Sequence, residues 1–138
     1  MKITKVVEIG KRMLVVATFL GIVAVSPMMA QEKVSPIMAH DLVGASGKEV
    51  QMYTVDFPAG FASPIHRHNS QVSVYVLEGS VVMQVRGGKE VTLKPGDSFY
   101  ENPDDIHVVS RNASDSKPAK FLVFLIKEKN APSLVLAK

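Results

Sequence analysis

Short runs of alternating apolar and polar residues recur from residue 31 to the C-terminus. An alternation of period two places one row of side chains on a buried face and the next row on an exposed face, so each run predicts a β-strand. Turn-forming residues separate the runs, which follow one another at intervals of about ten residues. The predicted strands are Ile37–Leu42, Glu49–Phe57, Val72–Leu77, Val81–Arg86, Glu90–Leu93, Ser98–Tyr100, Ile106–Ser110 and Phe121–Lys127.

The turn residues indicate how these strands are connected. Gly87 and Gly88 lie between two β-rich runs, and paired glycines supply the positive φ that a tight hairpin turn requires. No stretch between Gln31 and Lys138 has a sustained helical period, and no linker or internal repeat divides it. Many short strands with close turns are typical of a sandwich or a small barrel. Residues 31–138 are therefore expected to form a single all-β domain.

The first thirty residues have a different pattern. Four basic residues precede an uncharged apolar run, Met13–Val25, and Ala30 ends the segment before polar sequence begins. A basic start, a short apolar run and a small residue at the end are typical of a secretory signal peptide. A core helix and an uncleaved membrane anchor are the alternatives, although a membrane span needs roughly 20 apolar residues. We expect cleavage after Ala30 and a secreted or periplasmic protein without stable membrane insertion.

The composition limits the possible functions. The chain has 138 residues, 46% hydrophobic and 21% charged, which suits one globular domain. It has no cysteine, so a disulfide scaffold, a thiolate metal site and a cysteine nucleophile are excluded. The formal net charge of +3 comes from residues 1–30 alone, because the remaining residues contain equal numbers of basic and acidic side chains. Without a basic surplus in the domain, nucleic-acid binding is not expected.

Three of the four histidines are candidates for metal binding. His66 and His68 are separated only by Arg67, and alternate residues of an extended chain share a face, so both imidazoles are expected to point the same way. His107 follows a turn and opens an apolar run, from which the opposite wall of a barrel could deliver a third ligand. The alternative is a polar strand edge at the pair and a hydrogen-bonded core histidine at 107. His40 is isolated on a polar segment and is expected at the surface.

Two dispersed motifs resemble those of the cupin superfamily. Gly60-x5-His66-x-His68, followed by the run YVLEG, resembles the first cupin motif, G-x5-H-x-H-x(3,4)-E-x6-G. Gly96 and His107 match the separation in the second motif, G-x5-P-x-G-x2-H-x3-N. The resemblance covers most of the predicted domain. It implies a small antiparallel jelly-roll β-barrel, which is often a homodimer, with one divalent transition metal ion inside the barrel mouth.

The resemblance also assigns the metal ligands by position. It makes His66, His68 and His107 the three histidine ligands and leaves the choice among Fe, Zn, Ni, Cu and Mn open. The glutamate of the first motif falls at Val72, whose side chain cannot coordinate a metal ion. A bulge or register shift would bring the amide oxygen of the neighbouring Gln71 inward as a replacement.

Three further side chains are candidates for the site. Glu101 precedes the second-motif turn, and if it points inward it either replaces the missing carboxylate ligand or acts as a catalytic base. The alternative for Glu101 is a surface carboxylate or one that accepts hydrogen bonds within the loop. Tyr75 and Tyr100 are candidates for the lining of a substrate pocket, although aromatic residues on half-buried strands more often serve packing.

The function that the resemblance implies is that of an exported metal-binding cupin, similar to the small quercetin-dioxygenase-like members. The implied reaction is a dioxygenation of a small enolic or diketone-like substrate that chelates the metal ion. A cupin isomerase that acts on a sugar-like ligand is one alternative. A non-catalytic protein of the cell envelope that binds a metal ion or small ligand is the other. In every case the expected partner is a small molecule.

Overall fold

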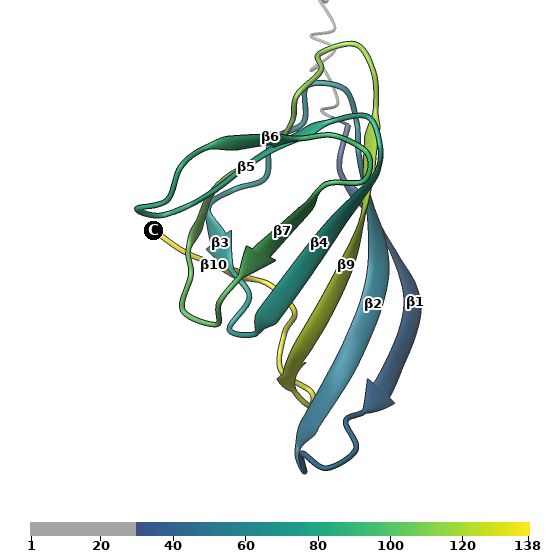
Figure 1. The fold of residues 1–138 in the computed structure, drawn as a ribbon, viewed down its shortest axis with the longest axis vertical. Helices are drawn as coiled ribbons and strands as arrows, with labels where there is room; N and C mark the ends of the chain where they lie inside the picture. The colour runs from purple at the N-terminus through teal and green to yellow at the C-terminus, as the bar shows by residue number, and fades with distance from the viewer. Residues whose placement is uncertain (1–29) are drawn as a thin grey trace, which may run out of the picture.

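The computed structural model describes residues 30–138, which form two antiparallel β-sheets of five strands each (Figure 1). One sheet has the strand order β1-β2-β9-β4-β7, and the other has the order β10-β3-β8-β5-β6. The strands are β1 (Lys33–Asp41), β2 (Lys48–Phe57), β3 (His66–Arg67), β4 (Gln71–Glu78), β5 (Val81–Val85), β6 (Val91–Leu93), β7 (Ser98–Glu101), β8 (His107–Asn112), β9 (Ala119–Glu128) and β10 (Val135–Leu136).

The expected all-β fold is confirmed, and a strand overlaps each of the eight predicted runs. The predicted hairpin is also present, since β5 and β6 pair with Val81 opposite Leu93 and Gly87 has a φ of 81°. Strands β3 and β10 were not predicted, because two residues are too few to show a period. The proposed signal peptide lies outside the described residues except for Ala30. None of the described residues belongs to a helix of the length and hydropathy that a membrane span requires.

The long strands of the first sheet form one curved wall, in which β4, β9, β2 and β1 lie side by side (Figure 1). Strands β2 and β9 pair along their full lengths, from Lys48 opposite Glu128 to Phe57 opposite Ala119. Alternate residues of a strand share a face, and the inward rows are apolar at Val55 and Phe57 of β2 and at Ala119, Phe121, Val123 and Leu125 of β9. The buried core of the molecule comprises Val55, Phe57, Val72, Val74, Val76, Val81, Met83, Leu93, Ala119, Phe121, Val123 and Leu125.

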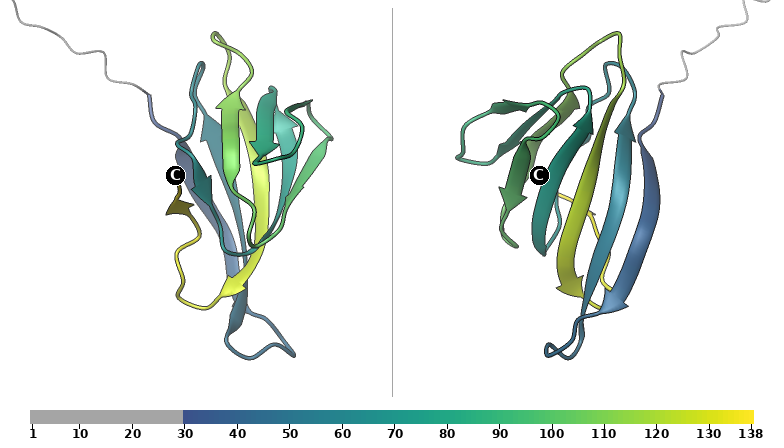
Figure 2. Two further views of the ribbon diagram at one scale, coloured as in Figure 1. Left: turned by 90° about the vertical axis from the view of Figure 1, so that its left-hand side faces the viewer. Right: turned by 45° about the vertical axis from the view of Figure 1, so that its right-hand side comes forward.

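The C-terminal segment returns toward the second sheet. After β9 the chain turns at Asn130, which has a φ of 65°, and its last short strand β10 lies beside β3 (Figure 2). Val135 is opposite Arg67, and Leu136 is opposite His66. This pairing brings residues at the end of the chain next to the histidine motif, and it positions the site described below.

Candidate metal centre

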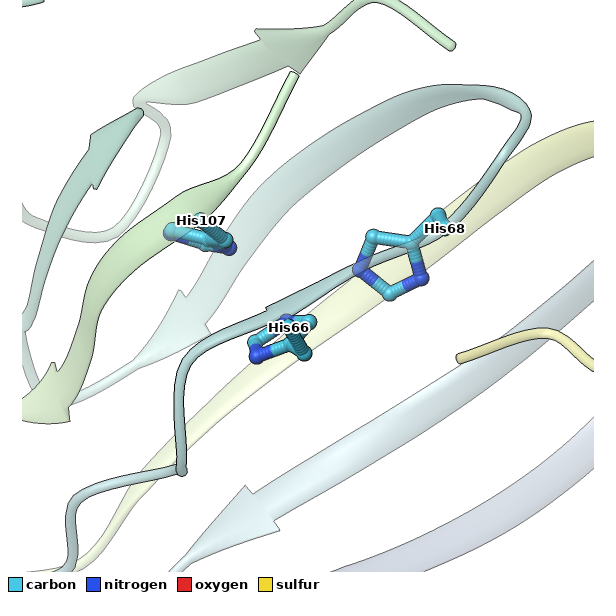
Figure 3. Close-up of side chains that lie close together, drawn as sticks. All are labelled: His66, His68 and His107. Atoms are coloured by element: carbon cyan, nitrogen blue, oxygen red, sulfur yellow. The ribbon is translucent and has the colours of Figure 1, made fainter. Parts of the chain in front are cut away.

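Strands β3 and β8 bring the three candidate histidines together. His66 begins β3, His68 follows its end, and His107 begins β8. In the antiparallel pair of β3 and β8, His66 is the direct partner of His107. The sequence suggested delivery of His107 from the opposite wall, but the structure places it on the neighbouring strand of the same sheet. The short pairing of β3 with β8 therefore aligns the motifs, and Figure 3 shows the three imidazoles side by side.

The three imidazoles converge on one point. One nitrogen atom from each of His66, His68 and His107 lies within 4.8 Å of the others, and the ring of His66 is 5.0 Å from each of the other two rings, centroid to centroid. His66 and His107 are buried, and the side chain of His68 is 10% exposed. Three imidazole nitrogens at this spacing, largely shielded from solvent, have the chemistry of a transition-metal site.

Hydrogen bonds to backbone carbonyls set the tautomers of two of these histidines. His66 Nδ1 donates to the carbonyl oxygen of Pro64 at 2.8 Å, and His68 Nδ1 donates to the carbonyl oxygen of Ser133. A histidine that donates through Nδ1 keeps the lone pair of Nε2 available as a ligand. The nitrogens of His107 have no hydrogen-bond partner within the described residues, although both are buried. A buried ring nitrogen whose lone pair has no hydrogen-bond partner fits a ligand of a bound metal ion.

Burial favours the neutral form of all three imidazoles. It lowers the pKa of His66 and, with the charge of His66, that of His68. Burial and the charges of the other two imidazoles lower the pKa of His107 to about 3. Because only the neutral ring can coordinate, this shared environment favours metal binding over protonation at ordinary pH.

Glu101 points into the same cluster, as the inward alternative for this residue required. It is 2% exposed, and its Oε2 lies 3.5 Å from Nδ1 of His107 and 3.9 Å from Nε2 of His68. Oε2 has no hydrogen-bond partner within the described residues. Burial, followed by the charge of Asp105, raises the pKa of Glu101 to about 7. The site therefore contains a carboxyl group that lacks the usual stabilisation of a buried charge.

Three other candidates lie on outward-facing positions. Gln71 is exposed, whereas its neighbour Val72 is 1% exposed and lines the cavity beside the histidines. Tyr75 and Tyr100 are 47% and 51% exposed and are not among the cavity-lining residues. Strand alternation explains all three placements, because the inward row of β4 begins at Val72 and that of β7 consists of Phe99 and Glu101. The structure therefore does not bring these side chains to the site, and His40 is exposed as expected.

The three histidines line a cavity of about 440 Å³. Most of its walls are apolar and include Val55, Val72, Val74, Met83, Phe121 and Val123. Besides the three histidines and Glu101, its polar side chains are those of Glu32, Gln51, Tyr53, Ser63, Ser110 and Ser133. A cavity with mostly apolar walls and convergent polar groups is typical of a small-molecule site.

Sequence reasoning missed these polar residues and one backbone group. Tyr53 lies in the same row of β2 as Val55 and Phe57, so the alternation alone could have placed it inward. Burial and the charges of Glu101 and Glu32 raise the pKa of Tyr53. The Ser133 carbonyl that orients His68 lies in a segment without a motif, and no signal in the sequence indicated its role.

A family model described as "Cupin domain" matches residues 53–125 of this chain. No curated protein sequence matches the chain. Among solved structures, the DMSP lyase DddQ from Ruegeria pomeroyi DSS-3 is 25% identical, with a TM-score of 0.56 over 64% of this chain and 43% of that chain. The chain thus spans less than half the length of that lyase.

Two further solved structures share the fold at lower identity. Oxalate oxidase in complex with the substrate analogue glycolate is 21% identical, with a TM-score of 0.58 over 77% of this chain and 55% of that chain. An uncharacterized protein with a double-stranded β-helix domain from Klebsiella pneumoniae is also 21% identical, with a TM-score of 0.58 over 82% of this chain and 90% of that chain. The last match extends over nearly the whole of that smaller protein.

Proposed function

The chain belongs to the cupin family, and we propose that it is an exported metal-dependent dioxygenase for a small enolic or diketone-like substrate. The observation that carries the proposal is the group of three buried imidazoles on the wall of an apolar cavity. A structural role for these histidines would satisfy their ring nitrogens by hydrogen bonds, whereas those of His107 have none within residues 30–138. We infer that the group holds one divalent transition metal ion.

His66, His68 and His107 would hold this ion. When bound, the ion would supply Lewis acidity toward the chelating oxygens of a substrate. The carbonyls of Pro64 and Ser133 orient two of the imidazoles through their Nδ1 atoms. The protein thereby presents neutral donors in a fixed arrangement, and the ligand set is compatible with Fe, Zn, Ni, Cu or Mn.

The cavity walls favour a substrate with an apolar body. Val72 and Val74 of β4 lie beside Phe121 and Val123 of the neighbouring strand β9 on the cavity wall, and apolar walls of this kind exclude water from the reacting groups. A sugar-like ligand would leave most of its hydroxyl groups without partners among such side chains. The cavity therefore favours an enolic or diketone-like substrate over the substrate of a sugar isomerase.

Similarity to the DMSP lyase DddQ, which is 25% identical, supports an enzymatic role over passive binding. The quercetin-dioxygenase-like assignment is our proposal for the subtype. Export rests on the signal-like pattern of residues 1–30, and a homodimer is proposed from the family alone. Mass spectrometry of the exported protein tests the first point, because a retained Met1 would contradict cleavage.

Oxygen consumption by metal-loaded protein tests the function. Untagged protein purified from its native compartment is first analysed for its metal content, and a panel of diketones and enols is then supplied. The proposal expects stoichiometric metal and oxygen uptake that is lost in His66→Ala and kept in Arg67→Ala, whose side chain is exposed. Tight ligand binding without turnover would instead identify a non-catalytic binding protein, and absence of metal binding would contradict the proposal as a whole.

A further inference from the structure

The pairing of β4 with β7 places an acidic residue beside Val72. Val72 stands where the first cupin motif has its glutamate, and its side chain faces the cavity. In the antiparallel pair of β4 and β7, its direct partner is Glu101. Side chains that are directly opposite in such a pair lie on the same face, with Cβ atoms about 4.5–5.5 Å apart. The carboxylate missing from β4 is thus present one strand away, at the same level of the sheet.

The surroundings of Glu101 indicate that its carboxyl group meets a cation. It is among the largest fully buried side chains of the described residues. Within residues 30–138, the ionisable groups nearest to its Oε2 are the neutral imidazoles of His68 and His107, and no lysine or arginine pairs with it. A buried carboxylate without a compensating charge is strongly unfavourable, so such groups are paired or coordinate metal ions.

The distances fit a shared coordination sphere. Ligand atoms that are each about 2.0–2.2 Å from one ion lie on the order of 3.0–3.5 Å from one another. Oε2 of Glu101 is 3.5 Å from Nδ1 of His107 and 3.9 Å from Nε2 of His68. Nε2 is the nitrogen that the hydrogen bond of His68 to Ser133 leaves available as a ligand. A small closure of the side chains around an ion would bring Oε2 into contact with it.

We propose that Glu101 is the fourth protein ligand of the metal centre and that the carboxylate ligand has moved from β4 to β7. The inference depends on the proposed function, since it requires that the three histidines bind a metal ion. It gives the site three neutral donors and one anionic donor, and it leaves the methyl groups of Val72 as part of the cavity wall. It also separates Glu101 from the role of a free catalytic base, which would keep its carboxylate away from the ion.

Metal affinity of matched variants tests this assignment without an assay of turnover. The variants are Glu101→Gln, the double variant Val72→Glu with Glu101→Gln, and the control Glu78→Gln, whose side chain is exposed. Zinc dissociation constants come from competition with a chromophoric chelator. We expect Glu101→Gln to weaken zinc binding by more than about 100-fold, beyond the roughly 10- to 100-fold that loss of an outer-shell partner costs. The double variant should recover at least part of this loss, and Glu78→Gln should match the wild type.

A second readout does not depend on any variant. In a crystal structure of the zinc-loaded wild-type protein, Oε2 of Glu101 should lie within about 2.2 Å of the ion. A carboxylate held away from the ion by a water molecule, or unchanged zinc affinity in Glu101→Gln, would overturn the assignment while leaving the three-histidine centre in place. Failure of the wild-type protein to bind zinc, iron, nickel, copper or manganese would instead contradict the proposed function itself. Melting of the metal-free variants, followed by circular dichroism, verifies that each one folds.

Discussion

His66 and His107 are direct partners across the antiparallel strands β3 and β8. Two motifs that are distant in the sequence are thereby joined by one position of strand register. Because β3 has only two residues, its placement depends on β8 on one side and on β10 on the other. The geometry of the candidate metal centre therefore depends on these short pairings, and a bound ion that links their side chains should stabilise them in turn.

The first prediction concerns this coupling between metal binding and stability. Zinc at about 100 times its dissociation constant should stabilise the folded protein by about 2.7 kcal/mol, because it binds only the folded state. His107→Ala should lose most of this stabilisation, whatever the stability of its metal-free form. Differential scanning calorimetry with and without zinc measures the effect. Arg67→Ala, an exposed neighbour of the site, is the control and should respond as the wild type does.

A second prediction follows from the segment that holds His68. Ser133 accepts the Nδ1 proton of His68 with its carbonyl, and its hydroxyl donates to Oε1 of Gln51 at 2.8 Å. Lys127, which is 3% exposed and paired with Glu49, donates to the carbonyl of Ala131 at 2.6 Å. These bonds fix the C-terminal segment and, through it, the orientation of one ligand.

Loss of the Ser133 hydroxyl should therefore weaken zinc binding although no ligand is removed. We expect a loss of about 10-fold in Ser133→Ala, at the lower end of the range for outer-shell partners. Competition with a chelator measures the change. Ser73→Ala, at an exposed position of β4, is the matched control. Equal affinities of Ser133→Ala and the wild-type protein would show that the rest of the segment holds His68 without this bond.

The sequence allowed prediction of the main strands and of the histidine set for a physical reason. Alternation along β4 and β9 reports burial directly, and the spacing of His66 and His68 on an extended chain fixes a common direction. Pairing between distant strands leaves no such local pattern. The opposition of Val72 and Glu101 depends on the register of β4 with β7, which only the structure provides.

The same limit explains the remaining differences. Ser133 acts through its backbone carbonyl, and a backbone group has no residue-type signal in a sequence. Gln71 was considered as a ligand because a bulge would turn it inward, but the register of β4 with β9 is regular from Gln71 to Val76, and its side chain stays exposed. The irregularity of this pair lies at the other end of β4, between Val76 and Glu78.

A third prediction concerns Gly79, the glycine at the end of the first motif. Its φ is +68°, and a Cβ atom there would lie 2.5 Å from the carbonyl oxygen of Pro118 and 2.8 Å from Cα of Ala119. Gly79→Ala should therefore cost more than about 3 kcal/mol, since left-handed strain is added to a collision with backbone atoms that cannot move aside. Gly44 is the control, because its φ is +83° and nothing lies within 4 Å of its added Cβ.

Urea denaturation of the two variants separates strain from collision. Gly44→Ala should lose only about 1–2 kcal/mol from its left-handed backbone. An equal loss in both variants would mean that the β4–β5 turn shifts to accommodate the methyl group. A larger loss in Gly79→Ala would explain physically why this position of the motif holds glycine, because β9 begins directly against it.

The last prediction is a pH dependence of stability that arises at Tyr53. Burial, together with the charges of Glu101 and Glu32, raises the pKa of its phenol above the ordinary value of 10.0. Above that ordinary value the unfolded chain has lost the proton while the folded protein still holds it, so the free energy of unfolding falls as the pH rises. The fall approaches about 1.4 kcal/mol per pH unit for one such group. Tyr53→Phe has no phenol to ionise at this position and should retain more of its stability between pH 10 and 11, as measured by urea denaturation. Tyr75→Phe, on the exposed face, is the control and should follow the wild-type curve. Parallel alkaline curves for Tyr53→Phe and the wild type would show that the phenol ionises as readily inside the cavity as in the unfolded chain.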